Sequence, residues 1–132
     1  MNDLKYAIIC IDDDPFVLQM IGFQLNKVIN KKTTFLEFFT DPKLVSENIK
    51  ELIENQTEII AILVDYQMPK LNGSELIREI IRIYPDLKFI MLSGQANDII
   101  VDELVNENVL YEFVAKPWEE EELFQLIKPL LK

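Results

Sequence analysis

The chain has 132 residues and a formal net charge of −10, from 23 acidic and 13 basic residues, and it contains no histidine. Its length predicts one domain over residues 1–132 with a buried core, and its acidity argues against direct binding to nucleic acid or to membranes of anionic lipid. Without histidine, the usual general base and zinc ligand are absent, so the chemistry must come from carboxylates, hydroxyls and lysines.

The first apolar run, residues 6–11, predicts a buried strand, and Cys10 within it is the only cysteine of the chain. A single cysteine in such a run is typical of a small buried side chain and excludes an intrachain disulfide. The run begins close to the first residue, without a basic leader. We therefore expect a cytoplasmic rather than a secreted protein.

Apolar runs of strand length alternate with segments of helical periodicity along the whole chain. Strands are predicted over residues 6–11, 33–39, 59–64, 88–92 and 110–115. Helices are predicted over residues 15–29, 41–55, between 73 and 85, over 97–108, and from about 118 to the end. Five strand–helix repeats predict an α/β fold with a doubly wound parallel five-stranded sheet, which binds ligands at the carboxyl ends of its strands.

Three consecutive aspartates, Asp12, Asp13 and Asp14, follow the first predicted strand and precede Pro15. Asp14 before Pro15 is typical of a helix start, with Asp as the N-cap and proline in the first turn. This interpretation leaves Asp12 and Asp13 unexplained, and adjacent carboxylates repel one another unless a cation shares the site. A hard divalent ion such as Mg²⁺, which takes oxygen ligands, would compensate them.

Three other strands also end in conspicuous polar residues. Asp65 follows the third predicted strand, Ser93 the fourth and Lys116 the fifth. Taken singly, each is explained as a turn residue or a solvated side chain. Because the carboxyl ends of parallel strands meet at one edge of a sheet, a single pocket explains all of them together.

The chemistry of these residues predicts phosphoryl transfer. Carboxylates around Mg²⁺ hold a cation that neutralises charge on phosphoryl oxygens. Asp65 is expected to be the nucleophile, because carboxylates form aspartyl-phosphate intermediates, while Ser93 and Lys116 offer a hydroxyl and an ammonium donor. Without a histidine base, the chain is suited to accept and keep a phosphoryl group rather than to turn it over as an enzyme.

Four motifs in register resemble the receiver domain of two-component response regulators, over essentially the whole chain. They are IDDDP at residues 11–15, VDYQMP at 64–69 with Asn72–Gly73, LSG at 92–94, and VAKPW at 114–118. The resemblance implies a flavodoxin-like fold with strand order 2-1-3-4-5. It also implies phosphorylation by a sensor histidine kinase or a histidine phosphotransfer protein, and control of a downstream output protein or domain.

The resemblance assigns a metal site by position. Asp65 would accept the phosphoryl group and, with Asp13, bind Mg²⁺ directly, with Mn²⁺ able to substitute. Asp12 would contribute through a water molecule, and the backbone carbonyl of Gln67 would complete the protein ligands. Gln67 and Gln95 would flank the pocket and influence how long the phosphorylation lasts.

The resemblance also assigns the residues that respond to phosphorylation. Ser93 and Lys116 would contact the phosphoryl group, and the Lys116–Pro117 peptide would be cis, which only X-Pro bonds adopt at low cost. The Ser93 hydroxyl would move toward the phosphoryl group while Phe113 swings inward. Phe113 lacks the hydroxyl of the tyrosine often found at this position, and its alternative role is that of a plain core residue.

The fourth helix, the fifth strand and the fifth helix would form the output surface, through which partners bind or a homodimer forms. The apolar candidates on this surface are Phe113, Trp118, Phe124 and Leu126. These side chains either form an exposed docking patch or pack under neighbouring loops.

Two other functions compete with phosphoacceptance. A phosphorylation-independent interaction module with the same fold is the first, and it is disfavoured because each site residue of the family is present. An aspartyl-phosphate phosphatase is the second, but residues 64–67 lack the second acid of that class and the length leaves no room for a cap domain. Whether the chain is a stand-alone receiver or part of a longer protein stays open.

Overall fold

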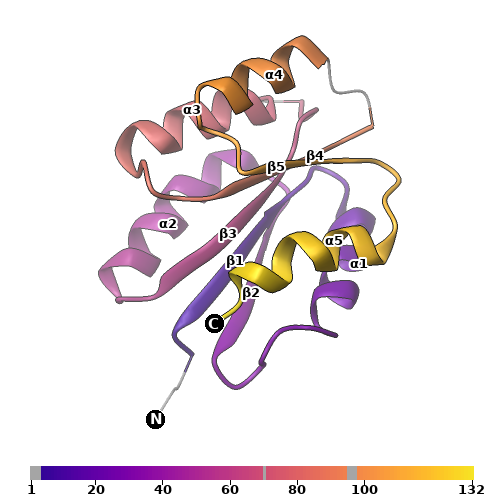
Figure 1. Ribbon diagram of the computed structural model, residues 1–132. Helices are drawn as coiled ribbons and strands as arrows, with labels where there is room; N and C mark the ends of the chain where they lie inside the picture. The colour runs from indigo at the N-terminus through magenta and orange to yellow at the C-terminus, as the bar shows by residue number, and fades with distance from the viewer. Residues whose placement is uncertain (1–3, 70, 95–97) are drawn as a thin grey trace.

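Five parallel β-strands form the centre of the molecule in a computed structural model that describes residues 4–69, 71–94 and 98–132. The strands are β1 (Tyr6–Ile11), β2 (Thr34–Phe39), β3 (Glu58–Asp65), β4 (Phe89–Ser93) and β5 (Glu112–Ala115). They lie in the order β2-β1-β3-β4-β5 (Figure 1). The flavodoxin-like topology expected from the sequence is therefore confirmed.

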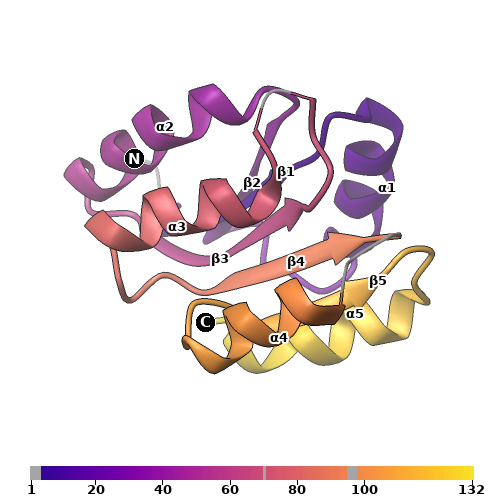
Figure 2. The ribbon, with the colours of Figure 1, turned by 90° about the horizontal axis from the view of Figure 1, so that it is seen from above.

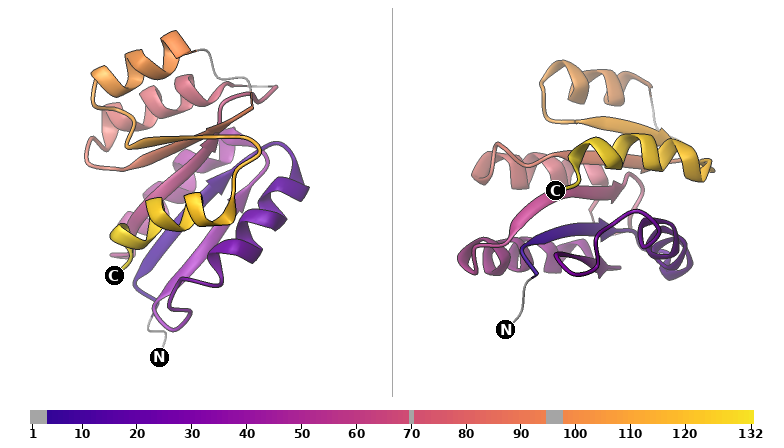
Figure 3. Two further views of the ribbon diagram at one scale, coloured as in Figure 1. Left: turned by 45° about the vertical axis from the view of Figure 1, so that its right-hand side comes forward. Right: turned by 60° about the horizontal axis from the view of Figure 1, so that its bottom comes forward.

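Helices cover both faces of this sheet. They are α1 (Pro15–Leu25), α2 (Val45–Glu54), α3 (Gly73–Ile83), α4 (Asp98–Asn106) and α5 (Glu120–Ile127). α1 and α5 pack on one face, and α2, α3 and α4 pack on the other (Figures 2 and 3). In the part of the chain that the structure describes, no helix is both long enough and apolar enough to cross a membrane.

The strand side chains alternate between two hydrophobic cores, which explains why the strands read as continuous apolar runs. In β1, Ala7, Ile9 and Ile11 face the core beneath α2 and α3, while Ile8 and Cys10 face the core beneath α1 and α5. These five side chains are fully or almost fully buried. The predicted burial of Cys10 is confirmed, and its thiol has a raised pKa because the site excludes water.

α1 ends earlier than its apolar periodicity predicts, at Leu25 instead of Ile29. The N–H groups of Lys27 and Val28 bond to carbonyls three residues earlier in the chain, instead of four. This hydrogen-bond pattern tightens the chain into turns. An apolar residue at helical spacing is therefore not enough to extend the helix beyond Leu25.

α5 begins two residues later than predicted, so Trp118 lies in the loop before it. Glu119 is the N-cap of α5 and forms a capping box with Glu122. Trp118 is buried and its indole Nε1–H donates to Gln24 Oε1 at 2.9 Å, which ties the loop to α1. Phe124 is buried as well. Of the two alternatives that the sequence left open, packing within the molecule therefore holds for Trp118 and Phe124, because both aromatic rings are buried.

The register of the strands brings their carboxyl ends to one edge of the sheet. Asp65 at the end of β3 pairs with Leu92 of β4, and Ser93 at the end of β4 pairs with Ala115 of β5. The residues that follow β1 and β5 emerge at the same edge, because all five strands run in one direction. This edge is where parallel sheets bind their ligands.

Candidate functional site

Three carboxylates from two neighbouring strands gather at the carboxyl edge of the sheet. Asp12 and Asp13 follow β1, and Asp65 ends β3, the strand next to it. One carboxylate oxygen from each residue lies within 4.8 Å of the other two. Asp12 and Asp65 are buried, while Asp13 is exposed to solvent. The cluster is thus buried at Asp12 and Asp65 and accessible to solvent at Asp13.

Lys116 joins this cluster from the loop after β5. Its Nζ lies 2.8 Å from Asp12 Oδ2 and 3.0 Å from Asp65 Oδ1, so one ammonium group donates to both buried carboxylates. The peptide between Lys116 and Pro117 is cis, the isomer that the family resemblance implied. The structure therefore brings together Asp12, Asp13, Asp65 and Lys116, which lie far apart in the sequence.

The three consecutive aspartates have different surroundings. The second oxygen of Asp12, Oδ1, accepts a hydrogen bond of 2.9 Å from the backbone N–H of Asp14. The Asp14 side chain accepts from the N–H of Phe16 at 2.9 Å, which makes it the N-cap of α1, as the sequence predicted. Asp13 is exposed beside them, with one carboxylate oxygen turned toward the cluster. Within the run, only Asp14 is explained by helix capping alone.

The pKa values of this group reflect burial opposed by ion pairing. Burial raises the pKa of Asp65 from 3.8 to about 6, because the loss of hydration outweighs the hydrogen bond from Lys116. Burial raises the pKa of Asp12 in the same way. For Lys116, burial favours the neutral amine, but the hydrogen bonds to both aspartates outweigh it and raise the pKa. Three carboxylates facing one ammonium leave an excess of negative charge.

This excess of oxygen ligands fits a hard divalent cation. Mg²⁺ binds oxygens at about 2.1 Å, so two ligands on opposite sides of an octahedral ion are about 4.2 Å apart. The carboxylate oxygens of Asp12, Asp13 and Asp65 lie within 4.8 Å of one another, close to that spacing. Gln67 follows two residues after Asp65 in the loop to α3, and the role of its carbonyl as a ligand stays a prediction.

The other residues named by the sequence lie around this cluster or outside it. Ser93 is buried at the end of β4, level with Ala115 of β5. Phe113 of β5 is partly buried and packs against the core beneath α2, α3 and α4. Leu126 of α5 is partly buried on the opposite face. Gln95, expected to flank the pocket, lies outside the described residues.

Gly73 contributes a constraint that sequence reasoning missed. A Cβ at this position would lie 2.5 Å from the carbonyl oxygen of Asp65 and 3.0 Å from Cα of Tyr66. The Gly73 N–H donates to the Tyr66 carbonyl at 2.7 Å, and Asn72 caps α3 by accepting from Glu75 N–H at 2.9 Å. α3 therefore starts directly against the backbone of Asp65. An Asn N-cap followed by glycine at a helix start was the available signal.

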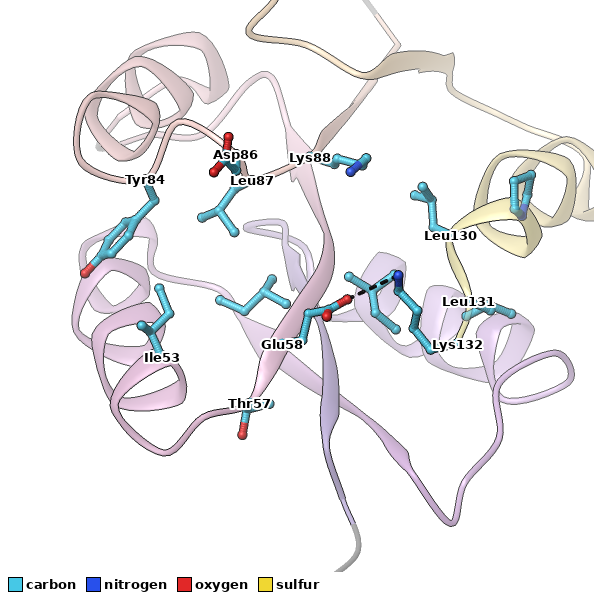
Figure 4. Close-up of a pocket in the computed structure, with 13 residues that line it drawn as sticks. Ile53, Thr57, Glu58, Tyr84, Asp86, Leu87, Lys88, Leu130, Leu131 and Lys132 are labelled. Atoms are coloured by element: carbon cyan, nitrogen blue, oxygen red, sulfur yellow. Dashed lines mark ion pairs between the residues drawn. The ribbon is translucent and has the colours of Figure 1, made fainter.

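A hollow lies at the opposite edge of the sheet from the acidic cluster, where β3 and β4 begin (Figure 4). It is a cavity of about 690 Å³ with apolar walls that include Ile53, Leu87 and Leu130. Lys132 Nζ lies 3.6 Å from a carboxylate oxygen of Glu58, so these two charges compensate each other. The acidic cluster has uncompensated negative charge, and three carboxylates and one ammonium group converge in it. It is therefore the better candidate for the functional site.

Comparison with known proteins places the chain in a family. The family model of the response regulator receiver domain matches residues 8–128 of this chain. The chain therefore belongs to this family, whose members act as phosphoacceptors. The transcriptional regulatory protein DegU of Brevibacillus brevis is 28% identical over 128 residues, which cover 97% of this chain and 51% of DegU. The chain thus spans about half the length of this relative.

Solved structures agree with this assignment. A response regulator receiver domain protein from Clostridium thermocellum is 27% identical, with a TM-score of 0.74 over 96% of this chain and 94% of that one. The CheX–CheY complex with BeF3 and Mg²⁺ from Borrelia burgdorferi gives a TM-score of 0.80 at 16% identity, over 96% of this chain and 90% of that one. At that identity, the second likeness concerns the fold alone.

The close contact at Gly73 predicts a large difference between two Gly→Ala substitutions. Gly73→Ala should lower the free energy of unfolding by about 1–3 kcal/mol, because the new methyl group overlaps the backbone of Asp65. Gly94→Ala is the control, since its Cβ would meet Lys116 atoms only at 3.7 and 3.8 Å, an ordinary contact distance. Urea unfolding measures both. Equal stability of the two variants would contradict the contact.

The raised pKa of Asp65 predicts a pH-dependent gain in stability for Asp65→Asn without metal. The folded protein holds the Asp65 proton more tightly than the unfolded chain, so ionisation costs stability as the pH rises through about 6. At about pH 7, with chelator present, the free energy of unfolding of Asp65→Asn should be about 1–3 kcal/mol higher than that of the original chain. The gain should fall to about half near pH 5, where Asp65 is largely protonated.

Asp102→Asn, an exposed acid on α4, is the matched control and should show little difference at either pH. A loss of stability in Asp65→Asn near neutral pH would mean that the ion pair with Lys116 outweighs the cost of burial. Urea unfolding at the two pH values decides between these outcomes.

Proposed function

We propose that this receiver takes a phosphoryl group onto Asp65 in the presence of Mg²⁺ and transmits the change through its α4–β5–α5 surface. The observation that carries the proposal is the double ion pair of Lys116 with Asp12 and Asp65, beside the carboxylate of Asp13. It supports the proposal because phosphoryl transfer needs a nucleophile, metal ligands and a cationic donor in one pocket.

Each residue of the pocket has a role in this proposal. An ionised Asp65 oxygen attacks the phosphorus atom, a new O–P bond forms, and the bond from phosphorus to the donor's imidazole nitrogen breaks. With a pKa of about 6, Asp65 is mostly ionised at neutral pH and available for attack. Lys116 then pairs with a phosphoryl oxygen as a charge-assisted donor, and the Ser93 hydroxyl donates to another.

Asp12, Asp13, Asp65 and the backbone carbonyl of Gln67 are the residues that would hold Mg²⁺, and Mn²⁺ suits the same oxygen ligands. When bound, the ion neutralises charge on the phosphoryl oxygens. The similar fold of the Borrelia burgdorferi CheX–CheY complex, which contains Mg²⁺ and BeF3, supports such a site. The excess negative charge of the acidic cluster supports it independently.

Receiver domains pair with histidine kinases and output domains, which defines the partners that we propose. A sensor histidine kinase or a histidine phosphotransfer protein would supply the phosphoryl group, and an output protein or domain would read the change. Phosphorylation adds about −1.5 to −2 charge at Asp65. Movement of Ser93 and Phe113 would carry this change to the α4–β5–α5 surface, where a homodimer or an output partner binds.

A phosphorylation-independent interaction module is the second candidate. It would keep the fold without using the pocket, but the complete set of acids with Lys116 favours phosphoacceptance. For either function we propose a cytoplasmic protein that does not contact nucleic acid or membrane directly, in line with its net charge of −10.

Labelling with acetyl phosphate tests the role of Asp65. The original chain should gain the mass of one phosphoryl group in Mg²⁺ and none in chelator, since the reaction needs the metal. Asp65→Asn should gain no label, because the amide is not a nucleophile, and Asp102→Asn should be labelled like the original chain. Intact-mass spectrometry measures the product. An Asp65→Asn protein that gains the same label at the same rate would refute the assignment.

Lys116→Ala should separate metal binding from phosphoryl binding. Mg²⁺ should still bind, because the three carboxylates remain and lose a competing ammonium group. The affinity for beryllofluoride should fall about tenfold or more, because a charge-assisted hydrogen bond is worth roughly 1.5–3 kcal/mol. Trp118 fluorescence reports both events, since its ring is buried two residues from Lys116.

Lys50→Ala, an exposed lysine on α2, serves as the control and should bind both ligands normally. Unchanged beryllofluoride binding by Lys116→Ala would rule out its proposed contact with the phosphoryl group.

A further inference from the structure

α1 exposes an apolar stripe that belongs neither to the acidic cluster nor to the α4–β5–α5 surface. Phe16 is 77% exposed, Met20 43% and Phe23 67%. These residues recur every three to four positions, so they line one face of the helix, a pattern typical of a helix that packs against another helix. The core-facing side of α1 is separate, because Leu18 and Ile21 are buried against the sheet.

The composition of α1 also differs from that of a solvated helix. None of its eleven residues, PFVLQMIGFQL, is charged, whereas 27% of the residues of the chain are charged. A helix that is apolar on its outer face as well as its inner face is usually covered.

A groove lies beside this stripe. It has a volume of about 420 Å³ and is lined by residues that include Leu18, Gly22, Phe23 and Phe38. Phe38 of β2 approaches α1 closely, since a Cβ on Gly22 would lie 3.0 Å from its ring. The stripe thus carries a protruding aromatic side chain, Phe16, and the groove that could receive one lies on the adjoining flank of α1, toward β2, with Phe23 at the boundary between them.

Charges at the two ends of α1 are opposite. Asp13 and Asp14 precede the helix, while Lys27, Lys31 and Lys32 follow it, and all five residues are exposed. Two copies packed antiparallel would bring the acidic end of each helix to the basic end of the other. Parallel packing would place like charges together, which is unfavourable. This arrangement matters because two chains of charge −10 repel each other elsewhere.

We propose that the α1 face, defined by Phe16, Met20 and Phe23, binds a second copy of this chain in an antiparallel, two-fold symmetric dimer. The midpoint between Phe16 and Phe23 falls between Gln19 and Met20, so the two-fold axis passes there. Phe16 of each copy then packs at Phe23 and the groove of the other, as an isologous interface requires. The dimer does not require phosphorylation at Asp65, although Asp13 belongs both to this interface and to the proposed Mg²⁺ site.

The symmetry also brings Lys27 of one copy opposite residues 12–13 of the other. Lys27 pairs with Glu120 at 2.6 Å and lies over the Phe23 ring at 4.6 Å within its own chain. It is nevertheless exposed at 46% of its side chain, which leaves it accessible to a second carboxylate. The Asp13 carboxylate, exposed beside the stripe, is the complementary group.

Disulfide crosslinking tests the location of the interface in the full chain. Cys10 is fully buried, so the original chain should not crosslink. Met20→Cys places a thiol at the proposed axis and should give a covalent dimer on oxidation, because the two thiols face each other. Ile53→Cys on α2 is the matched control, since Ile53 is 41% exposed and Met20 43%. It should stay monomeric on a non-reducing gel.

Sedimentation over a wide concentration range tests the affinity. The original chain should dimerise reversibly, and Met20→Glu should raise the dissociation constant about tenfold or more, because each dimer would then bury two like charges. Met20→Glu should unfold in urea like the original chain, since Met20 is solvent-accessible in the monomer.

Three outcomes would overturn the proposal. The original chain could remain monomeric at every concentration. A Val105→Cys variant on α4 could crosslink while Met20→Cys does not, which would assign the dimer to the α4–β5–α5 surface. The α1 face could lose its solvent exposure only when a phosphodonor protein is added. That result would make the phosphodonor the occupant of the stripe.

Discussion

The burial of two carboxylates at the end of a parallel sheet is the constraint on which this site depends. Asp12 and Asp65 lose most of their hydration, and burial raises the pKa of each. Lys116 offsets part of this cost by donating to both. One ammonium group cannot neutralise three acids, so the excess negative charge suits the divalent cation that we propose for this site. In the proposed function, the same ammonium would exchange a carboxylate partner for a phosphoryl oxygen, which suits a reversible switch.

The fold makes this arrangement possible because every strand ends at the same edge. Neighbouring strands deliver the acids, and the loop after β5 delivers the lysine from the far side of β4. α3 starts against the backbone of Asp65, where only glycine fits at residue 73. Asp65, the proposed phosphoacceptor, is therefore positioned both by β3, which it ends, and by the start of α3. This backbone support adds to the hydrogen bond from Lys116 in fixing the position of the Asp65 carboxylate.

Much of this could be predicted from the sequence. The apolar runs identified the strands, since β1 and β3 are buried on both faces and tolerate few polar residues. Asp14 was recognisable as an N-cap, because that role depends only on the next two residues. The boundaries of α1 and α5 were less predictable. They depend on competing hydrogen bonds in the turns, such as the capping box at Glu119, which apolar periodicity does not report.

The sequence by itself determined the chemical inventory of this protein: clustered acids, a lysine and a serine at strand ends, and no histidine. Local spacing carries this information because strand and helix periods are short. The tertiary structure decided which of these groups touch and which surfaces stay free. It paired Lys116 with Asp12 across 104 residues, buried Trp118 and Phe124, and left Phe16 and Phe23 of α1 exposed. Contacts between distant residues and solvent exposure depend on how the elements pack together, which no local pattern specifies.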